Sequence, residues 1–212
     1  MFKRNQVEEA IAGVLEPGSA KPSSELCTRL KRLLETDRAF GRNKRSPDPE
    51  RANFAFYSMD APGRGLENWF TGYEAFALLT GLWLMREGWP QGLVVAVLRR
   101  VKPDLERHHA RVLKQNISVL FDNDLIRRQA RAGDLGASNT DPVYLVIKSK
   151  DREHDAGANP AAICQGQAEL MGFIKTWGAG QTWTVTELGT SIRALSLALT
   201  KTVPRKRGRP SP

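Results

Sequence analysis

The stretch that most constrains the fold runs from Tyr73 to Glu87 and reads "YEAFALLTGLWLMRE". Its apolar residues occupy most faces of a helix, so other elements must surround it to keep these residues from water. The apolar part, Ala75 to Met85, is much shorter than the roughly 20 residues that cross a bilayer. The sequence therefore predicts a central core helix and no membrane partner.

Two amphipathic helices are predicted before the core helix. Apolar residues recur at helical spacing from Val7 to Leu15, and "EPGSAKPSS" then stops the pattern with prolines and a glycine. Ser23 or Ser24 can cap the second helix, whose apolar stripe runs from Leu26 to Leu34. We therefore expect a helix, a break and a second helix at the start of the chain.

A hairpin and two more helices are expected on either side of the core helix. Aromatic-rich runs that flank "DAPGRG" predict a β-hairpin pairing Phe54–Ser58 with Glu67–Thr71. Pro90 starts a helix, and Pro103 opens another. The second of these repeats an apolar residue every seven positions, at Leu105, Val112, Val119 and Ile126. This stripe predicts either a homo-oligomer interface along the helix Leu105 to Ile126 or packing of that helix against the rest of the same chain.

The C-terminal part of the sequence predicts a small α/β module. "VYLVIKS" reads as a strand, and a helix is expected from about Ala161 to Thr176. "QTWTVTE" reads as a second strand, and "ELGTSIRALSLALTK" as the last helix. The polar stretch from Arg131 to Pro142 is the best candidate for a boundary between two halves of the chain.

The charge balance favours a polyanionic partner. Lys and Arg number 32 against 23 acidic residues, which gives a net charge of +9. Without the four cations near the C-terminus the charge is still 9 − 4 = +5. Basic proteins bind polyanions such as nucleic acid or anionic membrane, and the shortness of the apolar run favours nucleic acid. The alternative is a cationic surface that only keeps the protein soluble.

The sequence favours a reducing compartment and carries no catalytic constellation. Cys27 and Cys164 are too few for a disulfide framework or a zinc site, and "MFKRNQVEEA" lacks the apolar segment of a secretory signal. His108 and His109 are adjacent and cannot act as paired metal ligands on one helix face. His154 lies among charged residues in a polar loop. We expect a cytoplasmic, nucleoid-associated protein, or a nuclear one in a eukaryote, with no enzymatic activity, cofactor or metal.

The chain ends in "PRKRGRPSP". This stretch resembles the AT-hook, whose core is Arg-Gly-Arg-Pro. The matching core is Arg207, Gly208, Arg209 and Pro210, and its basic flank is Arg205 and Lys206. The resemblance implies binding in the minor groove of A·T-rich DNA. The alternatives are a nuclear address in a eukaryotic protein and a tail that only adds solubility.

The chemistry of this core suits the minor groove independently of the resemblance. The groove over A·T-rich DNA is narrow and strongly negative, and it presents acceptors at its floor. Gly208 has no side chain to strike the floor, and Pro210 biases Arg209 toward an extended backbone. The two guanidiniums can then lie along the groove, while Lys206 and Arg205 pair with phosphates.

Residues 2 to 102 resemble the winged helix-turn-helix domain of MerR-like regulators. The shared features are a helix, a break, a helix, a hairpin, and the glycine-containing turn in "YEAFALLTGLWLMREGWPQGLVVAVLRRV". The resemblance implies that the second helix enters the major groove and that the hairpin tip contacts the DNA backbone. The residues expected to contact DNA in this region are Thr28, Arg29, Lys31, Arg32, Arg42, Lys44, Arg45 and Arg64.

The expected fold class is mainly α with a small β component (α+β). The expected divisions are a winged-helix-like region 1–130, a linker 131–142, a small α/β module 143–200 and a disordered, AT-hook-like tail 201–212. The functional hypothesis is a DNA-binding transcriptional regulator or chromosome-associated factor. The alternatives are a protein-interaction or assembly module, whose apolar helices from Tyr73 to Ile126 contact a partner, and a small-molecule-sensing domain.

Overall fold

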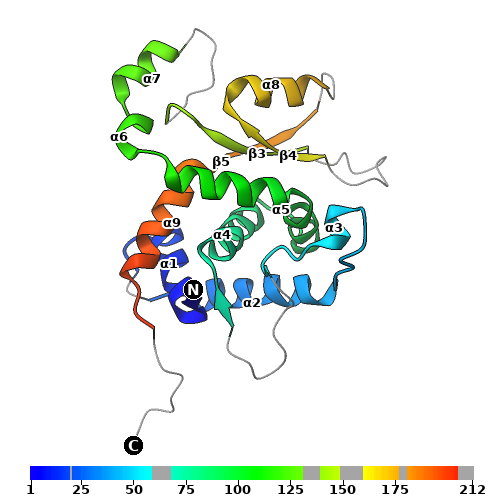
Figure 1. Ribbon diagram of the computed structural model, residues 1–212. Helices are drawn as coiled ribbons and strands as arrows, with labels where there is room; N and C mark the ends of the chain where they lie inside the picture. Colours follow the sequence, from blue (N-terminus) through cyan, green and yellow to red (C-terminus); the bar gives the residue numbers. More distant parts are fainter. Residues whose placement is uncertain (20, 59–67, 131–138, 149–159, 177–180, 205–212) are drawn as a thin grey trace, which may run out of the picture. The chain divides into compact units, whose positions relative to one another are not determined.

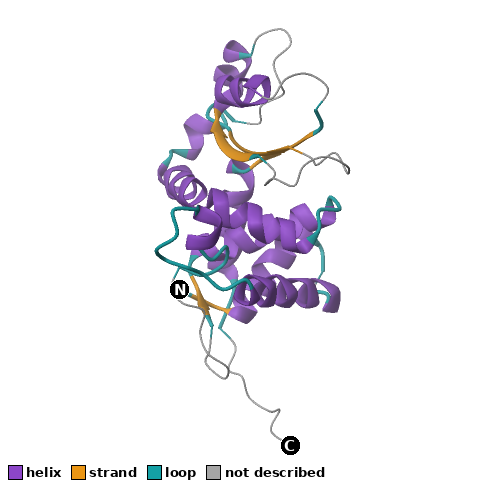
Figure 2. Ribbon diagram, turned by 90° about the vertical axis from the view of Figure 1, so that its right-hand side faces the viewer, coloured by secondary structure: helices purple, strands orange, loops and turns teal. Residues whose placement is uncertain are grey.

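The computed structural model describes residues 1–19, 21–58, 68–130, 139–148, 160–176 and 181–204. These residues are mostly helical, with two small antiparallel sheets, which confirms the expected α+β class (Figures 1 and 2). The chain divides into two compact units, Met1–Arg100 with Ala194–Pro212, and Val101–Arg193. None of the helices in the described ranges is both long and apolar enough to cross a membrane.

The first unit is built around the helix that the apolar run predicted. This helix, α4 (Gly72–Arg86), lies against α1 (Arg4–Leu15) and α2 (Ser24–Ala39), and most of its residues are buried (Figure 1). At Gly81 a Cβ atom would lie 3.2 Å from Leu33 Cδ1 of α2, so a glycine permits the close approach of the two helices. The unit also contains α3 (Pro49–Ala52) and parts of α5 (Gln91–Lys114) and α9 (Gly189–Lys201).

The two N-terminal helices follow the sequence signals. Helix α1 ends at Leu15, as predicted, and Ser23 caps α2, because its Oγ accepts a hydrogen bond of 3.1 Å from the Leu26 amide. Glu16 Oε1 in turn accepts a hydrogen bond of 2.7 Å from Ser23 Oγ. A carboxylate at the end of α1 therefore fixes the start of α2.

The expected β-hairpin is wrong in its pairing. The run Phe54–Ser58 forms no strand, and β2 (Trp69–Phe70) pairs instead with β1 (Phe2–Lys3). Glu74 explains how the chain is held here without a hairpin. Its carboxylate accepts hydrogen bonds from the Ser58 amide at 2.5 Å and from the Thr71 amide at 2.7 Å, so it replaces strand partners for these amides.

The second unit contains a three-stranded antiparallel sheet in the order β4-β3-β5. Its strands are β3 (Val143–Lys148), β4 (Ala161–Gln165) and β5 (Trp183–Glu187), and its helices are α6 (Ile117–Leu120), α7 (Asn123–Gln129) and α8 (Gly166–Thr176), with parts of α5 and α9. The central strand β3 is buried along nearly its whole length. On one face, Tyr144 and Val146 pack against Cys164 and Leu170.

The predicted helix from Ala161 to Thr176 is half correct. Its first five residues form β4, and the helix α8 begins only at Gly166. Gly166 has a φ of +71°, which a glycine adopts at little cost, so the chain can turn from strand to helix there. Pairing with the buried strand β3 outweighs the helical preference of the alanines at 161 and 162.

The predicted helix start at Pro103 and the single predicted helix from Leu105 to Ile126 are also wrong. Pro103 lies inside the continuous helix α5, which ends at Lys114. Asn116 and Asp122 then cap the separate helices α6 and α7. Leu105 and Val112 are buried, whereas Val119 is 54% exposed, so the seven-residue repeat does not form one surface on one helix.

Two buried histidines make the stability of this unit dependent on pH. His108 and His109 on α5 are only 6% and 7% exposed. Burial lowers the pKa of His109 from 6.5 to about 4. Burial, followed by the neighbouring Arg111 and Arg107, also lowers the pKa of His108. Both imidazoles are therefore neutral in the folded protein at neutral pH, whereas the unfolded chain takes up protons below pH 6.5.

We predict that the free energy of unfolding falls as the pH drops from about 6.5 to 4. The unfolded chain binds more protons than the folded chain in this window, and His109 alone accounts for about 2–3 kcal/mol of the fall. Urea unfolding at several pH values measures the effect. His109→Gln, which stays neutral, should flatten the dependence, and an unchanged slope in this variant would contradict the assignment.

Candidate nucleic-acid interface

Helix α2 presents one apolar face and one basic, exposed face. Leu26, Leu30, Leu33 and Leu34 are buried. On the other side of the helix lies an exposed stripe that consists of Thr28, Lys31, Arg32, Glu35 and Arg38. The 3.6-residue period of the helix produces this separation, and it places three cations and one acid on the exposed side. We call these five residues the α2 stripe.

The cations of the α2 stripe form only weak interactions within the protein. Lys31 Nζ lies 3.7 Å from Glu35 Oε1, and both side chains are more than half exposed. An ion pair of this kind is worth little in water and yields readily to a competing anion. Arg38 Nη2 donates to Tyr57 Oη at 3.5 Å, and Thr28 Oγ1 donates to the Ser24 carbonyl at 2.8 Å. Lys31 and Arg32 are therefore the stripe residues best suited to meet phosphates.

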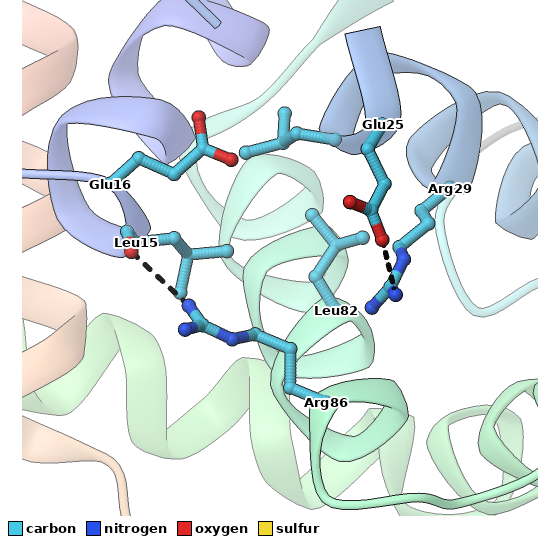
Figure 3. A pocket seen from close by; sticks show the side chains of 7 residues that line it. Leu15, Glu16, Glu25, Arg29, Leu82 and Arg86 are labelled. Carbon is cyan, nitrogen blue, oxygen red and sulfur yellow. Dashed lines mark hydrogen bonds and ion pairs between the residues drawn. The ribbon is translucent and has the colours of Figure 1, made fainter. Parts of the chain in front are cut away.

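Arg29, which was also expected to contact DNA, lies beside the α2 stripe in a small pocket (Figure 3). Its Nη2 atom lies 2.5 Å from Glu25 Oε1. The pocket has a volume of about 230 Å³, and its other lining residues are Leu15, Glu16, Leu26, Leu82 and Arg86. The positive charges of two arginines and the negative charges of two glutamates cancel in this pocket. Arg29 therefore adds little net charge to the exposed face of α2.

The basic surface continues from the end of α2 into the loop that contains Arg42, Lys44 and Arg45. Lys44 and Arg45 are exposed, and Arg42 is half-buried with its guanidinium 5.1 Å from the centre of the Phe54 ring. The Asn43 amide donates to the Arg51 carbonyl at 2.7 Å, and Asn43 Oδ1 accepts from the Arg45 amide at 3.1 Å. Asn43 thus holds the loop in one turn and keeps these cations near α2.

A buried ion pair joins this loop to α2. Asp37 is fully buried, and its Oδ1 atom lies 2.7 Å from Arg99 Nε of α5. The carboxylate also accepts hydrogen bonds from the amides of Ala55 and Phe56, at 3.1 and 3.0 Å. Arg99 in turn donates to the backbone carbonyls of Asp37, Gly41 and Glu50, the second at 2.7 Å.

This pair was missed in the sequence, although each residue leaves a signal there. Asp37 falls on the buried face of α2, three residues after Leu34, and Arg99 falls on the apolar stripe of α5 between Leu98 and Val101. A lone charge on an apolar face requires a buried partner. Two such charges of opposite sign on different helices would have predicted the pair.

The end of α9 lies at the start of α1. Gln6 Nε2 donates to the Thr202 carbonyl, and Asn5 Nδ2 donates to the Val203 carbonyl, both at 3.2 Å. Strand β1, directly before α1, pairs with β2, which follows residues 59–67. Strand β2 and the last described residues, Val203 and Pro204, therefore both lie near the start of α1. Arg64, His154 and the expected tail residues 205–210 themselves lie outside the described residues.

Comparisons with known proteins add no assignment to this geometry. No family model, curated protein or solved structure matches the chain. In the part of the chain that the structure describes, no three His, Cys, Asp or Glu side chains are grouped so as to hold a metal ion.

We predict that Asp37→Ala destabilises the protein by about 3–5 kcal/mol, because Arg99 is left buried without its counter-charge. Chemical denaturation measures the loss. Glu35→Ala is the matched control, since it breaks the exposed pair with Lys31 and should cost less than about 1 kcal/mol. A loss in Asp37→Ala as small as that of the control would show that the ion pair does not hold this region together.

Proposed function

We propose that this protein binds DNA through the α2 stripe and the cations of the loop at residues 42–45, and that the C-terminal tail adds a contact in the minor groove. The observation that carries the proposal is that Lys31 and Arg32 of α2 and Lys44 and Arg45 of the following loop are all exposed. The buried pair of Asp37 and Arg99 fixes both parts of this surface. A rigid, convex helix with exposed cations suits the major groove.

The tail supports the same function by different chemistry. Arg207, Gly208, Arg209 and Pro210 form a thin segment with many donors, which favours the acceptor-lined minor groove of A·T-rich DNA. The last described residues, Val203 and Pro204, lie beside the start of α1. A protein that combines both contacts would act as a regulator or a chromosome-associated factor, and Arg64 would add a contact with the DNA backbone.

One observation favours the assembly module as a second candidate. In the second unit, Leu113, Ile117 and Val119 are 41%, 59% and 54% exposed. These apolar side chains lie close together in sequence at the end of α5 and in α6. Exposed apolar groups of this kind are typical of protein contact sites. In that case the basic surface would add only non-specific affinity for nucleic acid.

We predict that replacing Lys31, Arg32 and Lys44 together by Ala weakens duplex binding at least tenfold at moderate salt. The slope of log K against log salt should shrink by about two to three, since each lost phosphate contact changes it by roughly 0.9. The matched control replaces Lys114, Arg127 and Arg128, which removes the same charge from exposed positions of the second unit. Equal losses in both triple variants would mean that net charge alone drives binding.

We predict that Gly208→Ala reduces the preference for A·T-rich over G·C-rich duplex although it changes no charge. The new methyl group lies where the backbone must approach the groove floor, and Arg209→Lys should act similarly by removing the planar fork of donors. Each change should cost about 1 kcal/mol or more on the A·T-rich duplex. Fluorescence anisotropy with both duplexes measures the change. Wild-type affinity in both variants would show that the tail acts only as a cationic tether.

A further inference from the structure

Strand β5 forms one edge of the three-stranded sheet in the second unit. The strand order is β4-β3-β5, and among the strands that the structure describes none pairs with the outer side of β5 (Figure 1). The edge of a sheet presents a row of backbone N–H and C=O groups that match those of another strand. The outer side of β5 can therefore accept a further strand.

The register of β5 against β3 determines which backbone groups point outward. The Leu188 amide donates to the Val143 carbonyl at 2.8 Å. In an antiparallel pair, residues that bond the neighbouring strand alternate with residues whose N–H and C=O groups point away from it. The residues of β5 that bond β3 are therefore Thr184 and Thr186. The residues with outward-pointing backbone groups are Trp183, Val185 and Glu187.

The sequence of β5 contains none of the residues that usually protect an edge strand from pairing. Proteins often place lysine or proline on such an edge. Strand β5 reads "WTVTE", and its one charged residue is Glu187. The Glu187 carboxylate accepts hydrogen bonds from the amides of Gly189 and Thr190, at 2.7 and 3.1 Å, so it is held at the start of α9. No charge along this edge therefore opposes a partner strand.

The opposite edge of the sheet, formed by β4, is partly blocked. The Gly166 amide bonds the Pro142 carbonyl at 2.8 Å, so by the same alternation the Gln165 amide points outward. This outward amide donates to Glu169 Oε2 of α8 at 2.7 Å. A carboxylate thus occupies the place of a strand partner on β4, and β5 is the edge that is more open to pairing.

The side chain of Val185 is exposed at the same edge. Val185 lies opposite Val146 of β3, which is fully buried, yet Val185 itself is 40% exposed. Its side chain lies on the same face of the sheet as that of Trp183, whose ring contacts the Phe173 ring of α8 with their centres 5.7 Å apart. A further strand beside β5 would cover Val185 and extend this apolar face.

We propose that β5 pairs antiparallel with β5 of a second copy of this chain, so that two three-stranded sheets join into one sheet of six strands. A two-fold axis between the two copies of Val185 brings all the outward-pointing groups of the two strands together. Trp183 then lies opposite the partner's Glu187, so that no like charges meet. Thr184 lies opposite the partner's Thr186, and threonine pairs of this kind stabilise antiparallel strands. This self-complementarity favours a second copy over an unrelated peptide.

The test measures the mass of the full-length protein by sedimentation equilibrium over a range of concentrations. The wild type should be a dimer. Val185→Pro removes only an outward-pointing amide, which an edge strand tolerates, so the sheet should still form. It should weaken dimerisation about tenfold or more, because both hydrogen bonds between the two copies of residue 185 lose their donors. Ile163→Pro is the matched control at an outward-pointing position of β4, and it should leave the dimer intact.

Disulfide cross-linking tests the register without disrupting the strand. In a Cys27→Ala background, Val185→Cys should link two chains on mild oxidation, because directly opposite residues of a hydrogen-bonded pair have Cα atoms about 5.5 Å apart. Thr184→Cys is the control. Its two copies would lie two residues apart along the paired strands, beyond the roughly 7 Å that a disulfide bridges. Cys164 is buried and stays in place.

Three results would each overturn the inference. These are a monomeric wild type, a dimer that is unaffected by Val185→Pro, and equal cross-linking through positions 184 and 185. The inference does not rest on the proposed DNA binding, whose described residues belong to the first unit. Loss of the dimer in Val185→Pro together with cross-linking through position 185 alone would support it.

Discussion

The ion pair between Asp37 and Arg99 is the interaction on which the basic surface depends. Removing two charges from water is costly, and the attraction between them offsets that cost only when their remaining hydrogen-bonding groups also find partners. The remaining groups do find partners here. Asp37 accepts hydrogen bonds from two backbone amides, and Arg99 donates hydrogen bonds to three backbone carbonyls. One pair therefore joins the end of α2, the following loop, the residues before α4, and α5.

The same pair also orders the basic surface that we propose binds DNA. Arg99 orders the loop with Lys44 and Arg45 through the carbonyls of Gly41 and Glu50, and it also supports the Phe40 ring. Residues whose backbone is held in place lose less conformational entropy when they bind a partner than residues of an unrestrained loop would. A helix of ordinary composition can in this way present an ordered basic surface.

The sequence predicted the helices better than the contacts between distant segments. The apolar periods of α1, α2 and α4, and the cap at Ser23, were read correctly because each is a local signal. The pairing of Phe2–Lys3 with Trp69–Phe70 involves two residues on each side and leaves no pattern to read. The strand Ala161–Gln165 was mistaken for helix because its identity comes from its buried partner β3. For the candidate site, the cations were predicted, but the buried pair of Asp37 and Arg99 depends on tertiary packing.

The central claim is that the α2 stripe and the loop at residues 42–45 contact DNA as one rigid surface. Mapping of amide chemical shifts by NMR during titration with an A·T-rich duplex tests it most directly. The account predicts that the largest changes occur together in residues 28–45, with Lys31, Arg32, Lys44 and Arg45 among them. Changes confined to residues 113–130, with none in α2, would contradict it, because the DNA would then contact the second unit.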